Sequence, residues 1–187
     1  MTGRYILISL LIILVAVAVL LGMGRIPFCK CGIISLWSSD VTSNQQSQQL
    51  TDPYTFTRVL HGIGFYFLIW LVFGSKLTIG QRLILAVAVE SGWEILENTE
   101  FILNRYRAAT ISYDYWGDSV FNSVGDIFAM MIGFWLAAKL PWWGSVIAFI
   151  AIDSLLLFFI RDSLVINIIM LIRPIEAIKQ WQQAQMN

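Results

Sequence analysis

The sequence predicts an all-α integral membrane protein, a single bundle of five or six transmembrane helices with a polar cleft on one face. The first observation is composition: of 187 residues, 58% are hydrophobic and 13% are charged. Soluble domains contain about 45–50% apolar and about 25% charged residues. The second observation is that the apolar residues form blocks close to the roughly 20 residues that a membrane-spanning helix needs. Together they exclude a soluble enzyme and a disordered chain.

Two further patterns narrow the class of protein. No block alternates between apolar and polar residues as the strands of a membrane barrel do, so helices are the expected way to satisfy the backbone inside lipid. The 12 Lys and Arg residues equal the 12 Asp and Glu residues in number and form no basic cluster. We therefore expect membrane lipid, and no nucleic acid, among the partners.

Six helices are expected in one domain that covers residues 1–187. The first apolar run is predicted to be a retained anchor and not a cleaved signal peptide, because no small-residue cleavage site follows it. The last helix reaches spanning length only if it continues past Pro174, a residue that kinks helices. The predicted helices cover 5–21, 59–73, 83–103, 119–138, 142–160 and 164–178, with a polar loop over 22–58.

Orientation in the membrane is predicted from the first helix. Lys and Arg residues divide six against six between the two sides of this arrangement, so the positive-inside rule does not choose between them. The first helix usually dominates insertion. We therefore expect a cytoplasmic amino terminus, a polar loop outside the cytoplasm, and a bacterial inner-membrane protein whose site lies on the periplasmic face.

Acidic residues are concentrated in two of the predicted helices. Seven of the 12 lie between Glu90 and Asp126. At 100° per residue, Glu90, Glu94 and Glu97 share an arc of about 60°, and Asp118, Asn122 and Asp126 share an arc of about 80°. A carboxylate at the bilayer centre costs about 2.5–3.5 kcal/mol or more, so these stripes need a partner, a cation or water. The two stripes are expected to face each other, with His61 at the mouth of the cleft.

Two catalytic chemistries suit these residues. Carboxylates combined with an imidazole bind a divalent metal ion, and the candidate ligands are Glu94, Glu97, Asp118 and Asp126. Without a metal, closely spaced carboxylates differ in pKa and act as acid and base. In that case the catalytic candidates are Glu94, Glu97 and Asp118, together with His61 as a proton carrier.

Substrate binding is assigned to residues beside the acids. Arg105 and Arg107 would hold a phosphate or carboxylate of a head group at the mouth, and Asn122 lies on the stripe of the following helix. These residues predict a membrane-embedded hydrolase or transferase that acts on a lipid or lipid-linked envelope substrate. A small transporter or proton conductor is the alternative, and so is a non-catalytic assembly factor that holds a partner with its polar loop.

The same residues could instead have purely structural roles. A lone histidine beside glycines is often a helix-packing residue, and buried acids can form a purely structural network. Gly62, Gly64, Gly125 and Gly133 are expected to allow close helix approach. Cys29 and Cys31 would pair in an oxidising compartment and stay reduced in the cytoplasm.

Several of these motifs resemble one family of bacterial multi-pass membrane proteins, UPF0314 or DUF2585. The resemblance extends from about Cys29 to Trp181. It implies an integral membrane protein and brings no activity with it. Its motifs are Cys29-Lys30-Cys31-Gly32, the stretch from Leu50 to Phe56, His61-Gly62, Trp93 to Asn98, Arg105 to Thr110 and Gly117 to Ser123.

A fainter resemblance is to the VanZ-like membrane proteins, which are linked to glycopeptide-antibiotic tolerance. They share an early histidine, a glutamate in the next helix, an arginine, and then Asp-x3-Asn-x2-Gly. The chain departs from that pattern in its additional acids, Glu97 and Asp126, and in its long polar loop. The matching positions are His61, Glu94, Arg107, Asp118, Asn122 and Gly125.

Overall fold

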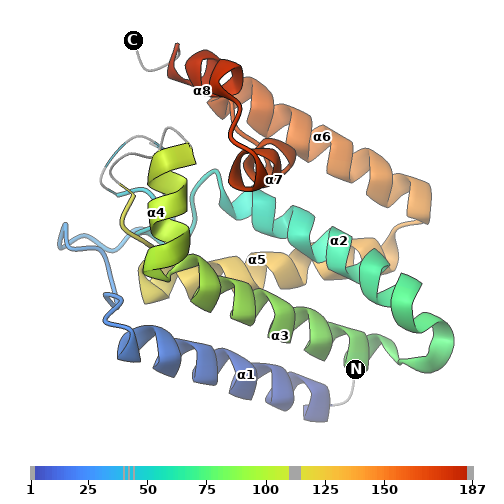
Figure 1. Cartoon of the computed structure of the whole chain (residues 1–187). Coiled ribbons are helices and arrows are strands. Elements are labelled where there is room, and N and C mark those ends of the chain that lie inside the picture. The colour runs from blue at the N-terminus through green and yellow to red at the C-terminus, as the bar shows by residue number, and fades with distance from the viewer. Residues whose placement is uncertain (1–2, 40, 42, 44, 110–114, 185–187) are drawn as a thin grey trace.

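The computed structural model describes residues 3–184, apart from positions 40, 42, 44 and 110–114. This part of the chain is helical and contains no strand, which confirms the predicted all-α class (Figure 1). Gly74–Lys76 adds one turn of 3-10 helix, η1, after the second helix. The helices are α1 (Gly3–Gly22), α2 (Thr55–Phe73), α3 (Ile79–Glu97), α4 (Glu100–Ala109), α5 (Val120–Lys139), α6 (Trp142–Ile160), α7 (Leu164–Ile172) and α8 (Glu176–Gln183).

Four of these helices are long and apolar enough to cross a membrane: α1, α2 extended through η1, α5 and α6. The equally long α3 lies in the same bundle and packs against α1, α2 and α5 (Figure 1). It does not count among the apolar spans because it carries four charged residues, Arg82 and three glutamates. The side of α3 that carries the acids is buried against these neighbours, as the cost of exposing charge to lipid requires, whereas Val89 and Leu96 on its other side are exposed.

Helices α2 and α5 form the closest contact of the bundle. A Cβ atom added at Gly62 would lie 1.9 Å from the carbonyl oxygen of Met130, and one added at Gly133 would lie 1.9 Å from that of Val59. The two backbones therefore touch where each helix offers a glycine. The predicted packing role is confirmed for these two residues, whereas Gly125 contacts the loop at Leu50 and Gly64 has open space beside it.

The predicted helix 83–103 is two helices in the structure. Asn98 ends α3: its main-chain N–H and its side-chain Nδ2 both bind the carbonyl of Glu94. The chain resumes as α4 after Thr99, in a different direction (Figure 1). The apolar pattern continues through Phe101 and Leu103, so composition alone conceals the break, whereas the side-chain amide of Asn98 supplies the bonds that end the helix.

The predicted last helix 164–178 also divides. Arg173 adopts extended backbone and ends α7, because Pro174 disfavours helical backbone in the residue before it. A second short helix, α8, begins at Glu176. Neither piece reaches spanning length, so the structure has no sixth long helix among its described residues.

The interior of the bundle is apolar at one end and polar at the other. Buried side chains of α1, α2, α3 and α5 form the apolar core, and they include Ile69, Leu83, Val87 and Phe134. The predicted polar loop folds over the opposite end, where Gln48 and Gln49 are buried. Gln48 Nε2 donates to the carbonyl of Gly117, and the carbonyl of Gln49 accepts from Asn122. The loop thus closes the polar end of the bundle.

Candidate functional site

A buried arginine occupies the centre of the polar end. Arg58 lies in the first turn of α2, where its guanidinium meets acids from two other helices. Its Nη2 is 2.5 Å from Glu97 Oε2 and 3.4 Å from Glu94 Oε1. Its Nε is 3.1 Å from Asp126 Oδ2 and 3.9 Å from Glu90 Oε1. The two acidic stripes therefore converge on one cation.

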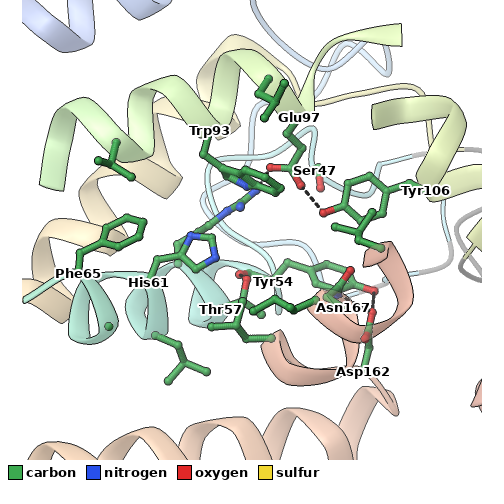
Figure 2. A pocket seen from close by; sticks show the side chains of 18 of the residues that line it. Ser47, Tyr54, Thr57, His61, Phe65, Trp93, Glu97, Tyr106, Asp162 and Asn167 are labelled. Atoms are coloured by element: carbon green, nitrogen blue, oxygen red, sulfur yellow. Dashed lines mark hydrogen bonds and ion pairs between the residues drawn. The ribbon is translucent and has the colours of Figure 1, made fainter. Parts of the chain in front are cut away.

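His61 lies one turn after Arg58, on the same face of α2. Its Nδ1 is 2.9 and 3.1 Å from the two carboxylate oxygens of Glu90, which is fully buried. A carboxylate accepts hydrogen bonds, so it favours the tautomer with the proton on Nδ1. In that tautomer Nε2 carries no proton, and the ring points into the cavity described below (Figure 2).

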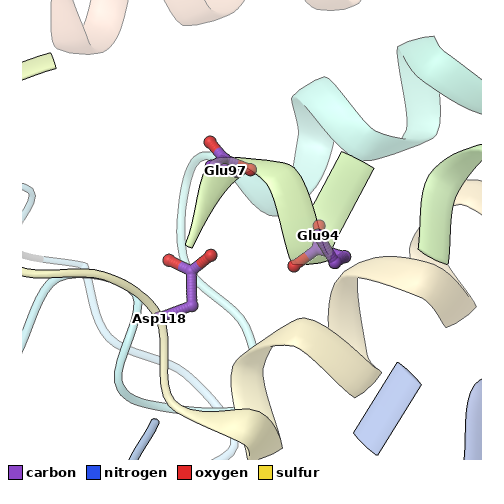
Figure 3. Close-up of side chains that lie close together, drawn as sticks. All are labelled: Glu94, Glu97 and Asp118. Carbon is purple, nitrogen blue, oxygen red and sulfur yellow. The ribbon is translucent and has the colours of Figure 1, made fainter. Parts of the chain in front are cut away.

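Three other carboxylates gather beside the arginine. Glu94, Glu97 and Asp118 each offer an oxygen within 4.8 Å of the others (Figure 3). Neither oxygen of Glu94 accepts a hydrogen bond in the described part of the chain, although the side chain is fully buried. Its nearest cation is Arg58, at 3.4 Å. Such a carboxylate is costly unless a further cation or a proton reaches it.

The charges of this cluster do not balance. Among the described residues, five buried carboxylates lie opposite one arginine, and the only imidazole is already paired with Glu90. An excess of this size in a buried site requires protons or a bound cation. The acids of the cluster are Glu90, Glu94, Glu97, Asp118 and Asp126.

Tyrosines from the segment after α3 bind the outer acids. Tyr106 donates its hydroxyl to Glu97 Oε1 at 2.9 Å, and Tyr115 donates to Asp118 Oδ1 at 2.7 Å. Burial, and then the charge of Asp118, hold the pKa of Tyr115 well above its usual value, so it stays a donor. Burial and the nearby charge of Glu97 raise the pKa of Asp118 to about 7. Asp118 therefore holds a proton more readily than an ordinary aspartate.

A cavity of about 630 Å³ adjoins this cluster, enclosed by α2, α3, α4 and α7 (Figure 2). Its polar end is formed by Arg58, His61, Glu97 and the tyrosines. Its remaining wall is apolar and includes Phe65, Leu68 and Val89. The volume is typical of ligand pockets, which measure about 300–1,000 Å³.

A second carboxylate group lines the same cavity from the turn between α6 and α7. Asp162 accepts the hydroxyl of Tyr54 at 3.2 Å and the amide of Asn167 at 3.0 Å. Burial raises the pKa of Asp162 to about 7. This side chain faces the cavity from the wall opposite α3 (Figure 2).

Among the predicted site residues, only His61 and Glu97 line the cavity; Glu94 and Asp118 do not, and neither do the four residues that follow. Arg105 donates to the carbonyls of Leu171 and Ile172, and Arg107 donates to that of Tyr115. Asn122 Nδ2 donates to the carbonyl of Gln49, and its main-chain N–H donates to the hydroxyl of Ser119, which caps α5. Asp126 is paired with Arg58 and accepts the hydroxyl of Thr55, so it lies behind the group of Glu94, Glu97 and Asp118. The bonds of these four residues hold neighbouring segments and Arg58 in place around the site.

Two features of the site were missing from the sequence prediction. Arg58 was counted only as a loop charge that sets orientation, although its spacing of three residues from His61 places both on one helical face. The tyrosines lie in a segment without periodicity, and no pattern indicated which acids they would meet.

Comparisons with known proteins place the chain in a family. A family described as "Protein of unknown function (DUF2585)" matches residues 20–184. The UPF0314 protein of Paracoccus denitrificans is 49% identical over 176 residues, which cover 94% of this chain and 91% of that protein. The UPF0314 proteins of Brucella anthropi and Sphingopyxis alaskensis are 47% and 42% identical, and the matches cover 94% of this chain and 89% and 93% of those proteins. No solved structure matches the chain. The chain therefore belongs to the DUF2585 family, as its sequence motifs indicated.

Proposed function

We propose that this protein is a membrane-embedded hydrolase that acts on a lipid or lipid-linked substrate. One observation carries the proposal: His61, and Glu97 of the buried carboxylate cluster, line a cavity that is polar at one end and mostly apolar along the rest. A polar reacting group with an attached hydrocarbon chain fits such a cavity.

His61 is the proposed general base. Glu90 holds the Nδ1 proton and stabilises the imidazolium that forms when Nε2 accepts another. Water gives its proton to Nε2 while its oxygen attacks the electrophilic centre of the substrate. The bond to the leaving oxygen then breaks, and the imidazolium returns the proton to that oxygen. An alcohol in place of water gives the corresponding transferase reaction.

Glu94, Glu97 and Asp118 are proposed to hold a divalent metal ion. The fully buried carboxylate of Glu94, whose oxygens accept no hydrogen bond in the described part of the chain, supports this, and so does the excess of acids over cations in the cluster. Oxygen donors suit Mg²⁺ or Mn²⁺. A bound ion would polarise the substrate's oxygen and offset the charge that develops there.

The distribution of polar residues favours an enzyme over an ion or proton conductor. A conductor needs polar groups along the whole path. Towards the far end of α3, the acids give way to Val87, Ala86 and Leu83, which are buried in the apolar core. The polar interior thus stops part-way through the bundle.

We also propose that the site faces the periplasmic side of the inner membrane. The loop that closes the polar end carries a disulfide between Cys29 and Cys31. Disulfides persist in oxidising compartments. This agrees with the orientation expected from the first helix.

The proposal is tested on lipid extracted from a strain that lacks the gene, in which the substrate accumulates. Purified full-length protein should hydrolyse a lipid of that extract. Mass spectrometry should then detect either one product heavier by one water molecule or two fragments whose masses together equal lipid plus water. His61→Asn and Glu90→Gln should lower the rate at least about 100-fold, since a general base contributes about 10²–10⁴. Glu100→Gln, which changes an exposed glutamate, is the matched control. Full activity of His61→Asn would contradict the proposal.

A further inference from the structure

We infer that the cavity binds a lipid with one hydrocarbon chain and a positively charged amine head group. The inference deepens the proposed function by naming a substrate class for the same site. It stands on the shape of the apolar wall and on the charges at the polar end.

The apolar wall has the form of a slot along two neighbouring helices. On α2 its apolar residues run from Leu60 to Leu68, and on the antiparallel α3 from Leu96 back to Val89. The distance from Leu60 to Leu68 is about 12 Å along the helix. The slot thus leads from the polar end of the bundle towards the middle of the membrane.

Two glycines leave the slot open. Gly64 of α2 and Gly92 of α3 both line the cavity, and a Cβ atom added to either would meet nothing within 4 Å. Helix glycines at packed contacts in this protein are different, because Gly62 and Gly133 leave no room for a Cβ. The space beside Gly64 and Gly92 is therefore available to a ligand and not to a packed helix.

One chain fits this space better than two. The cavity of about 630 Å³ lies in the range that encloses a drug-sized ligand. A phospholipid with two acyl chains is larger than such a ligand, and α2 and α3 pack against each other elsewhere along their length. A single chain lying between them fills the slot.

The charges at the polar end select the head group. Arg58 is the arginine that lines the cavity, and its guanidinium is shared by four carboxylates. The other two candidate anchors, Arg105 and Arg107, bind main-chain carbonyls. No other arginine or lysine is among the described residues that line the cavity, so a phosphate head group would find no unpaired guanidinium or ammonium group there.

An amine has favourable partners there. Glu97 and Asp162 line the cavity from opposite walls, and a positive charge bound between them would favour the ionised form of Asp162. Trp93, Tyr54 and Tyr106 add aromatic rings to the lining around the same end (Figure 2). Acids combined with aromatic rings are the common way in which proteins bind ammonium groups.

The test measures binding and not turnover. Purified full-length protein in zwitterionic lipid nanodiscs is titrated with hexadecylamine and with hexadecyl phosphate, and bound probe is counted by native mass spectrometry. We expect one hexadecylamine per chain, bound at least about tenfold more tightly than the phosphate, because like charges oppose each other in the second case. Equal or tighter binding of hexadecyl phosphate would overturn the amine assignment.

Variants at the glycines test the slot. Gly64→Leu should weaken hexadecylamine binding at least about tenfold by filling the slot. Gly92→Leu is a second variant from the facing helix, in case the first does not fold. Gly22→Leu, at the end of α1, has equally open space and lies away from the cavity, so it should bind like the wild type. Unchanged binding by folded Gly64→Leu or Gly92→Leu would overturn the single-chain slot.

This result is independent of the catalytic proposal. If hexadecylamine fails to bind but His61→Asn still abolishes lipid conversion, the proposed amine substrate class is wrong and the proposed hydrolase function is supported. If hexadecylamine binds at the slot but His61→Asn converts lipid normally, the binding site stands and the catalytic assignment is wrong.

Discussion

The two ends of the α2–α3–α5 bundle are built on the same helices with opposite chemistry. At one end, Ile69, Leu83 and Phe134 pack in an apolar core. At the other, Arg58 is surrounded by acids that outnumber it. The change occurs within one turn of α5, between Asp126 and Met130. The comparison suggests that the apolar end and the glycine contacts stabilise the fold, and that the polar end keeps a costly charge excess for its chemistry.

The largest expected effect comes from removing the central cation. Arg58→Met leaves four carboxylates without their shared partner, and breaking a buried ion pair in this way costs about 3–5 kcal/mol. Denaturant unfolding of the purified protein in detergent measures the loss. Arg82→Met is the matched control at the apolar end, where the guanidinium binds only the carbonyls of Gly74 and Leu77. The comparison fails if Arg58→Met costs no more than Arg82→Met.

A somewhat smaller effect is expected from the apolar end. Leu83 is fully buried in the core, so Leu83→Ala should cost about 3 kcal/mol through the cavity that it leaves. Leu71→Ala removes the same atoms from an α2 side chain that is 74% exposed within the chain, and should change stability little. The same unfolding assay measures both variants. Equal costs for both would show that the core does not stabilise the bundle.

A still smaller effect is expected from pH at the second carboxylate of the cavity. Burial raises the pKa of Asp162 from its usual 3.8 to about 7, so the folded protein keeps a proton that the unfolded chain releases. Stability should therefore fall as pH rises from about 4 to about 7. Asp162→Asn should make this decline shallower, leaving the part that Asp118 contributes. Thermal unfolding at several pH values measures the slope, and an unchanged slope would contradict the assignment. Glu100→Gln, at an exposed glutamate, should keep the wild-type slope.

The fold was predictable because its main signals are local. Apolar runs of spanning length predicted α1, α2, α5 and α6 with ends within a few residues. The break at Asn98 was not predicted, because apolar residues continue on both sides of it, and Pro174 was expected to kink the last helix, whereas it divides it. A hydrogen bond from the side-chain amide of Asn98 ends α3, and the restriction that Pro174 places on the backbone of Arg173 ends α7. Neither effect changes the hydropathy pattern.

The site was predictable in part. Helical spacing was sufficient to align Glu90, Glu94 and Glu97 on one face, and these residues do meet Asp126 and Asp118. The role of Arg58 depends on the crossing of α2 with α3 and α5, which one sequence does not contain. The same applies to Arg105 and Arg107, whose carbonyl partners belong to α7 and to the segment before α5.

The central claim is that the carboxylate cluster is a binding site and not only a structural network. The most direct measurement is the divalent metal content of purified protein, by elemental analysis after incubation with Mn²⁺ and desalting. We predict one ion per chain in the wild type and in Glu100→Gln, and none in Glu94→Gln or Asp118→Asn. Glu94→Gln loses its 3.4 Å ion pair with Arg58 but no hydrogen bond, and Arg58 keeps its closer pairs with Glu97 and Asp126, so the variant should stay folded. Retention of the ion by Glu94→Gln, or collapse of its fold with no ion in the wild type, would contradict the claim.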